Sequence, residues 1–269
     1  YKLMKPIKEK RGGAMLATER RQRIMQEMHE HKVVVIVELA EKLGVTPMTI
    51  RRDLNLLEQQ GLVEKSYGGA VLIESSIKEN PYLTRKQVKN PEKRLIAQAA
   101  ADLVEPSMSI YLDAGTTSYE LAALLVEKEY QQLTIVTNDL LVAHMVSQNS
   151  NYQVIILGGV IENANGLTCG YLAKEMIKNI HFDICFVGTQ AINSSMYGMT
   201  ANIDKVELKQ LYLKNSHMKV LLADDSKFGK YKLHNICSVG EFDLLISDRK
   251  FTEQETEYFH DNKVRIVKV

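Results

Sequence analysis

Seven short apolar runs alternate with amphipathic stretches through the later part of the chain. Continuous apolar strands separated by helices are typical of a parallel sheet that is covered by helices on both faces. The expected strands are SIYLD, LTIVT, QVIIL, DICFVG, KVLLA, DLLIS and VRIVKV. The expected helices lie at residues 92–104, 117–128, 139–148, 170–180 and 204–216. The pattern therefore predicts an α/β domain with a parallel sheet.

The first part of the chain has the helical periodicity of a small domain. Residues 18–31 predict one helix, and the stretch VELAEKLGVTPMTIRRDLNLLEQQG predicts two more. The last helix has clear end signals, because Thr46 fits the N-cap, Pro47 the first helical position and Gly61 the point where the helix stops. Two helices joined by a tight turn indicate a helix–turn–helix.

The last of these helices has one apolar side and one polar side. Ile50, Leu54 and Leu57 share a side that would pack on the domain core. An isolated pair of arginines is more often solvated surface charge, but a hydroxyl and two guanidinium groups on an anchored helix suit the major groove of DNA. The side chains expected to point away from the core or to flank that direction are Met48, Thr49, Arg51 and Arg52. Together with the N-cap Thr46, they are expected to contact DNA.

The stretch LVEKSYGGAVL follows Gly61 and predicts two short strands around a Gly-Gly turn. Its position directly after the helix–turn–helix indicates a wing. Lys65 and Tyr67 are then placed to meet the DNA backbone or the minor groove.

The whole first part resembles the winged helix–turn–helix of the DeoR family of bacterial transcriptional regulators. The resemblance is carried by the phrase TIRRDL…L…QG…GGA. It implies that Thr49, Arg51 and Arg52 contact DNA, with Lys65 and Tyr67 in the wing. The family more often has arginine and histidine at the two wing positions, and lysine keeps the charge but not the planar fork of arginine.

In the later part, the stretch YLDAGTTSYELAALL reads as a strand, a turn of small residues and the start of a helix. Backbone N–H groups at a helix N-terminus favour an anion, and the helix dipole adds to this preference. Gly115 allows close approach, and Thr116 and Thr117 add hydroxyl groups. The stretch therefore predicts a cradle for a phosphate-sized anion.

Small, hydroxyl-bearing or charged residues follow five consecutive expected strands. Because the carboxyl ends of parallel strands meet at one edge of a sheet, these residues should form one site. No Walker-type nucleotide loop is present in the sequence. The residues expected at this site are Asp113, Gly115, Thr116, Thr117, Thr137, Asn138, Gly158, Gly159, Gly188, Asp224, Ser226 and Lys227.

This later part also resembles the C-terminal sensor domain of the DeoR family, through DAGTT, VTND, LGG, GMT and ADDSKFG. That sensor domain is similar in turn to ribose-5-phosphate isomerase and related sugar-phosphate enzymes. The resemblance implies a phosphorylated sugar in the pocket. It implies further that Lys93, the turn at residues 115–117 and Lys227 contact the phosphate and the sugar.

The isomerases need acidic residues to move a proton between adjacent carbons. Alignment with them places Val187 and Gln190 where they have aspartates. It places Lys209, which we also expect in the effector site, at or beside their catalytic glutamate, with Glu207 close by. Valine cannot transfer a proton and glutamine is a poor substitute. We therefore expect a sensor and no enzyme.

The sequence thus predicts a DNA-binding repressor of carbohydrate-metabolism genes that a phosphorylated sugar relieves. Its expected partners are a double-stranded DNA operator, the sugar phosphate and further copies of itself, as a dimer or tetramer on repeated sites. One alternative is an active sugar-phosphate isomerase with an added DNA-binding module. Another is a DNA-binding protein whose later part only oligomerises.

The charge distribution agrees with DNA binding by the first part. Residues 1–72 hold 13 Lys or Arg against 9 Asp or Glu, which gives +4, and the remainder holds 21 against 24, which gives −3. Only the first part is thus expected to meet a polyanion.

The cysteines, Cys169, Cys185 and Cys237, are odd in number and widely spaced. They suggest neither a disulfide framework nor a zinc site, so we expect a reducing cytoplasm, no metal and no cofactor. No apolar run approaches membrane-spanning length, so no membrane partner is expected.

The polar segment ENPYLTRKQVKNPEK, with its two prolines, separates the two parts. We expect a winged helix–turn–helix at residues 15–73, a linker at 74–91 and an effector domain at 92–269. Residues 1–14 are expected to be a disordered extension or to be left over from cloning.

Overall fold

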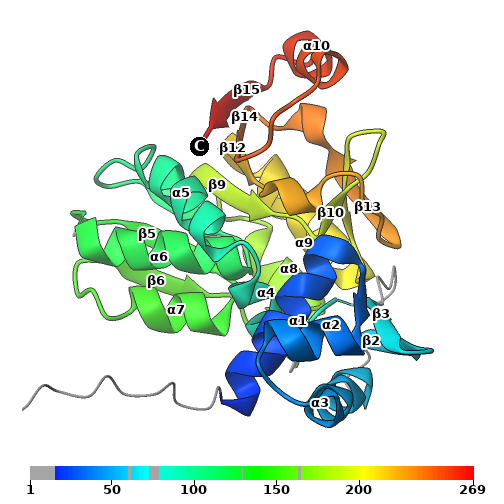
Figure 1. Ribbon diagram of the computed structural model, residues 1–269. Helices are drawn as coiled ribbons and strands as arrows, with labels where there is room; N and C mark the ends of the chain where they lie inside the picture. The colour runs from blue at the N-terminus through cyan, green and yellow to red at the C-terminus, as the bar shows by residue number, and fades with distance from the viewer. Residues whose placement is uncertain (1–15, 60–61, 73–78, 129, 163–164) are drawn as a thin grey trace, which may run out of the picture. The chain divides into compact units, whose positions relative to one another are not determined.

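The computed structural model divides the chain into two compact units, Tyr1–Glu74 and Ser75–Val269. It describes residues 16–59, 62–72, 79–128, 130–162 and 165–269. The extension expected at residues 1–14 lies outside these described residues. Figure 1 labels the helices and strands of each unit.

The first unit is a winged helix–turn–helix. Three strands form an antiparallel sheet in the order β1-β3-β2. The predicted apolar positions Ile50, Leu54 and Leu57 are buried in its core. The elements are α1 (Ala17–His31), β1 (Val33–Val35), α2 (Ile36–Lys42), α3 (Pro47–Gln59), β2 (Val63–Ser66) and β3 (Gly69–Leu72).

The wing turn differs from the one expected. Its two turn residues are Tyr67 and Gly68, and Gly68 has a φ of +85°. Gly69 belongs to β3 and not to the turn, and a Cβ there would lie 2.1 Å from the carbonyl oxygen of Val34. The second glycine is therefore required by close approach of β3 to β1 and not by turn geometry.

The second unit is built on a seven-stranded parallel sheet in the order β15-β14-β12-β9-β4-β5-β6. All seven apolar runs predicted from the sequence are strands of this sheet, so the predicted fold class is confirmed. Its strands are β4 (Ser109–Leu112), β5 (Thr134–Thr137), β6 (Gln153–Ile156), β9 (Phe182–Gly188), β12 (Ser216–Leu222), β14 (Leu244–Ser247) and β15 (Arg265–Lys268).

Helices cover both faces of the sheet, as the continuous apolar strands require. Ile110 and Leu112 of β4 pack in one core cluster, and Tyr111 between them packs in the other. Figure 1 shows α5, α6 and α7 side by side along one face. The helices are α5 (Asn90–Ala101), α6 (Thr116–Lys128), α7 (Leu140–Val146), α8 (Tyr171–Ile177), α9 (Ile203–Lys214) and α10 (Glu253–Asp261).

Several short elements were not expected from the sequence. The stretch proposed as a linker contains α4 (Tyr82–Gln87) and the start of α5. Pro81 lies at the N-cap of α4 and Pro91 in the first turn of α5, so both prolines begin helices. The other short elements are β7 (Val160–Glu162), β8 (Leu167–Cys169), β10 (Ala191–Ile192), β11 (Tyr197–Thr200), β13 (His234–Ser238), η1 (Asp225–Lys227) and η2 (Val239–Glu241).

The strand order places a switch point between β4 and β9. From β4 the chain adds β5 and β6 on one side, and from β9 it adds β12, β14 and β15 on the other. Ligands of open parallel sheets bind at such points, beyond the carboxyl ends of the strands. Across the described residues, every helix is too short or too polar to cross a membrane.

Candidate nucleic-acid interface and anion site

In the first unit, a groove of about 980 Å³ lies between α3 and the wing. Both Met48 and Tyr67 are largely exposed in it. Thr46 does not line the groove. Its Oγ1 accepts the backbone N–H of Thr49 at 3.3 Å, which makes it the N-cap that the sequence predicts. Six residues expected to contact DNA line the groove together: Met48, Thr49, Arg51, Arg52, Lys65 and Tyr67.

The buried carboxylate of Asp53 holds α3 against α1. Its two oxygens lie 2.5 Å from Nε of Arg20 and 3.4 Å from Nη1 of Arg21. The sequence analysis did not identify Asp53, although an acidic residue on the apolar side of a helix indicates a buried ion pair. Because Asp53 pairs with α1, the adjacent Arg51 and Arg52 side chains stay exposed at the groove.

Lys65 of the wing is in the groove, but its charge is already paired. Its Nζ lies 2.9 Å from Oε2 of Glu58 and 2.9 Å from Oδ1 of Asn55, both on α3. The hydrogen bond from Lys65 lowers the pKa of Glu58. Lys65 therefore ties the wing to α3, in addition to any contact it makes with DNA.

In the second unit, a cavity of about 60 Å³ lies at the switch point, where β4, β9 and the first turn of α6 meet. The predicted residues that line it are Asp113, Gly115, Thr116, Thr117, Asn138, Gly188, Lys209 and Lys227. The predicted residues outside its lining are Lys93, Thr137, Gly158, Gly159, Asp224 and Ser226.

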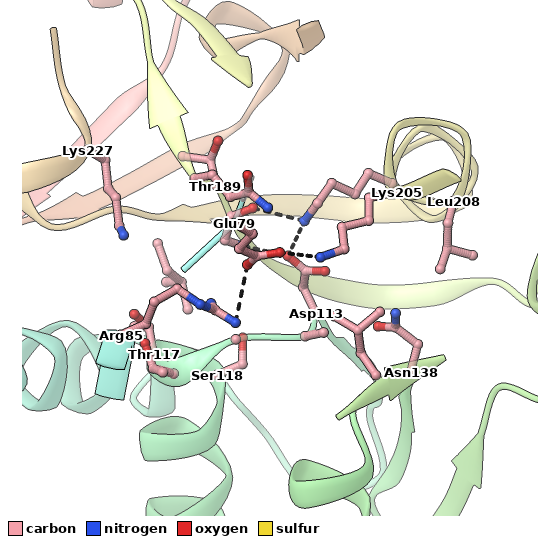
Figure 2. A pocket seen from close by; sticks show the side chains of 18 of the residues that line it. Glu79, Arg85, Asp113, Thr117, Ser118, Asn138, Thr189, Lys205, Leu208 and Lys227 are labelled. Carbon is pink, nitrogen blue, oxygen red and sulfur yellow. Dashed lines mark hydrogen bonds and ion pairs between the residues drawn. The ribbon is translucent and has the colours of Figure 1, made fainter. Parts of the chain in front are cut away.

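Two ion-pair groups occupy the cavity (Figure 2). Asp113, at the end of β4, pairs with Lys209 and accepts the backbone N–H of Gly188 at 2.9 Å. Glu79 pairs with Arg85 and with Lys205. These pairs join the ends of the sheet strands to α9 and to the segment that begins with Glu79.

Glu79, Arg85 and Lys205 were missed from the sequence. Lys205 and Lys209 are one helical turn apart on α9. Their spacing could have predicted that both side chains lie on the same face of the helix. Glu79 and Arg85 lie in the stretch that was interpreted as a linker, where no periodicity points to a cavity.

Lys227 differs from the other cations of the cavity. Among the described residues that line it, only the Lys227 ammonium group has no carboxylate within 4 Å. The turn before Lys227 is shaped by Asp224, whose Oδ1 accepts the backbone N–H of Ser226 at 3.0 Å. Asp224 and Ser226 thus position Lys227 and do not face the cavity themselves.

The anion cradle differs by one residue from the expected one. The backbone N–H of Gly115 donates to Oδ2 of Asp139 at 3.2 Å. Burial raises the pKa of Asp139 to about 6 against the opposing effect of such hydrogen bonds. The N–H groups of Thr116, Thr117 and Ser118 remain, since a first helical turn offers them no acceptor within the helix.

Lys93 lies beneath the cavity instead of in its lining. Its Nζ donates to the carbonyl oxygens of Arg85 and Val88, each at 2.5 Å. Burial, together with the nearby charge of Lys227, lowers the pKa of Lys93 to about 8. Lys93 therefore fixes the end of α4, which carries Arg85.

Thr137, Gly158 and Gly159 have structural contacts. Oγ1 of Thr137 accepts the backbone N–H of Asp139 at 3.1 Å. At Gly159, which has a φ of +146°, a Cβ would lie 2.4 Å from the carbonyl oxygen of Cys169. The backbone N–H of Gly158 donates to Sδ of Met176 at 3.1 Å.

The positions compared with the isomerases have the following contacts. Val187 is buried in the core, and Oε1 of Gln190 accepts the backbone N–H of Ala201 at 2.9 Å. Of the two residues left open near the expected glutamate, Lys209 lies in the cavity, whereas Glu207 is exposed and pairs with Lys174. Among the described residues, no cluster of three potential metal ligands occurs.

Comparison with known proteins matches both units. Residues 20–76 match the family described as DeoR-like helix–turn–helix domain, and residues 88–249 match the DeoR C-terminal sensor domain. The chain is 33% identical over 247 residues to the HTH-type transcriptional regulator GolR of Listeria innocua serovar 6a, covering 92% of this chain and 96% of that protein. It is 31% identical over 234 residues to the glycerol-3-phosphate regulon repressor of Escherichia coli strain K12, covering 87% and 92%.

Among solved structures, ribose 5-phosphate isomerase A from Methanocaldococcus jannaschii is similar with a TM-score of 0.38 and 17% identity. The match covers 52% of this chain and 55% of that one. This level of similarity carries no argument about the site.

Proposed function

The chain belongs to the DeoR family of transcriptional regulators, and we propose that it represses carbohydrate-metabolism genes until a phosphorylated sugar releases it from its operator. DNA binding belongs to the helix–turn–helix unit. Three properties are proposed beyond this: which residues read the DNA, which ligand the cavity takes and how many copies act together.

For DNA, we propose that α3 enters the major groove and that the wing contacts the backbone or the minor groove. Support comes from the groove that gathers Met48, Thr49, Arg51, Arg52 and Tyr67. Recognition by one such unit covers a short half-site, so a dimer or tetramer on repeated half-sites would supply the affinity.

For the ligand, the observation that carries the proposal is the charge of the cavity. Among the described residues, four cations line it against two carboxylates, and Lys227 is the unpaired one of the four. The first turn of α6 adds N–H groups and the positive end of a helix dipole. We propose that a phosphate group binds among Lys227, Arg85, Lys205 and this turn, while Asp113 and Ser118 offer polar groups to sugar hydroxyls.

The name of one relative contains a small phosphorylated compound. One is named for the glycerol-3-phosphate regulon and another, from Escherichia coli O157:H7, as a putative aga operon transcriptional repressor. Thermal unfolding with a panel of sugar phosphates tests the proposal. A ligand at 100 times its Kd adds about 2.7 kcal/mol to the free energy of unfolding. No shift with any member would favour a cavity without a ligand and an α/β unit that only oligomerises.

We expect no isomerase turnover with common aldose or ketose phosphates. The carboxylates that line the cavity, Glu79 and Asp113, are both held by cations, and the pKa of Glu79 is below its usual value despite its burial. A coupled assay on pentose and hexose phosphates measures this. Turnover that purifies with the protein and is lost in Asp113→Asn would establish the enzyme instead.

A further inference from the structure

The cavity holds a carboxylate that comes from outside the sheet. Glu79 lies before α4, five residues after Glu74, which ends the DNA-binding unit. Its side chain is 9% exposed, and its Oε1 lies 3.2 Å from Nη2 of Arg85, while Lys205 pairs with the other oxygen. Burial acts to raise the pKa of Glu79, but Arg85 and Lys205 hold it below its usual value. Glu79 is therefore ionised at neutral pH.

The two cations that hold Glu79 are among those proposed to bind the phosphate group. Arg85 and Lys205 line the same cavity as Lys227 and the first turn of α6 (Figure 2). Carboxylate and phosphate oxygens are accepted by the same guanidinium and ammonium donors. With Glu79 in place, the cavity leaves about 60 Å³ free. Glu79 therefore occupies donors that a bound phosphate group would use.

We propose that Glu79 is a built-in competitor of the ligand's phosphate group, and that binding of that group to Arg85 and Lys205 releases Glu79 from both cations. This inference rests on the proposed function. A phosphate monoester carries a charge of about −1.5 to −2 at neutral pH. Beside ionised Glu79 it would meet a like charge in a buried site, and release of Glu79 removes that repulsion.

Such a competition defines two states of the cavity. In one, Glu79 neutralises Arg85 and Lys205, and in the other the ligand does. The ligand shifts the balance by its difference in affinity for the two states. Glu79 follows Glu74, the last residue of the helix–turn–helix unit, by five positions in the sequence, so a change at Glu79 takes place close to that unit along the chain.

Glu162 offers a matched control. It also pairs with Lys205, at 3.2 Å from its Oε2, but it belongs to β7 and its side chain is 27% exposed. Glu162→Gln therefore removes one negative charge beside the same lysine and leaves Glu79 and Arg85 in place. Both carboxylates also accept from the side-chain amide of Asn165, which glutamine at position 162 can still do through its own oxygen.

The test is isothermal titration of the full-length wild type, Glu79→Gln and Glu162→Gln with inorganic phosphate. We expect Glu79→Gln to bind phosphate about tenfold more tightly than the wild type or better, because a buried competing charge is gone. Glu162→Gln should change the affinity by less, since its charge is more exposed. In the wild type, hydrogen exchange of the backbone amides of residues 79–86 should quicken when phosphate saturates the protein.

The outcomes separate this inference from the proposed function. Phosphate binding of equal strength by the wild type and Glu79→Gln, or exchange at residues 79–86 that is unchanged or slower with phosphate, would overturn the role of Glu79 and leave the anion site standing. Absence of phosphate binding by all three proteins would overturn the proposed site, and this inference with it. If Glu79→Gln fails to fold, the exchange measurement on the wild type decides alone.

Discussion

Replacing Arg52 with alanine should weaken binding to the specific operator by about tenfold to a hundredfold and relax discrimination at one base position. A bidentate contact between an arginine and a guanine contributes about 1–3 kcal/mol of discrimination. Arg52 is exposed on α3 and lines the groove, and it does not pair with the buried carboxylate of Asp53, which pairs with two arginines of α1. Folding should therefore be unaffected, and fluorescence anisotropy on operator and random duplexes measures the loss.

Lys65→Ala provides the contrast. If Lys65 contacts phosphates, its loss should weaken binding to specific and random DNA about equally and should reduce the salt dependence of binding. Since Lys65 also pairs with Glu58 and Asn55 on α3, part of its effect should come from a looser wing. Unchanged operator affinity in Arg52→Ala at physiological salt would mean that α3 is not the recognition helix.

Lys227→Met should give a protein that still binds its operator but no longer responds to the sugar phosphate, which amounts to permanent repression. Methionine keeps much of the packing of the lysine stem and removes the charge. Lys227 is the unpaired cation among the described residues of the cavity, so its loss removes the charge most available to a phosphate group. Titration of the variant–operator complex with the identified sugar phosphate measures the effect.

Lys250→Met is the matched control for this variant, because Lys250 is exposed and does not line the cavity. It should keep the wild-type response. The pKa of Lys93 gives a second, independent measurement of the position of Lys227. It should rise in Lys227→Met, because the nearby positive charge that lowers it is removed. Wild-type sensitivity in Lys227→Met would exclude Lys227 from the anion site.

The sheet of the second unit could be predicted from the sequence because its strands are buried on both faces. Each strand is a continuous apolar run, as at Ile110 to Leu112, and helices with their own period separate most of them. The short strands β7, β8, β10 and β11 were not found, because none of them contains a continuous apolar run of four residues. Helix α4 was hidden by prolines that begin helices as readily as they break them.

Residues directly after predicted strands could be assigned to one site, since the topology brings strand ends together. Asp113 and Gly188 do line the cavity. Glu79 and Arg85 could not be assigned, because their place depends on how the segment before α5 folds back onto the sheet. The hydrogen bond from the Gly115 N–H to Asp139 is a contact between two loops. No local sequence pattern predicts such a contact.

A phosphorylated sugar in the cavity is proposed to control the affinity of the first unit for DNA. The most direct measurement is anisotropy of the wild-type protein on a duplex it selects from a random pool, titrated with sugar phosphates and with the matching sugars that lack the phosphate. At least one sugar phosphate should release the DNA, and its dephosphorylated partner should not. Equal release by both members of a pair, or no release by any sugar phosphate that stabilises the protein, would contradict this control.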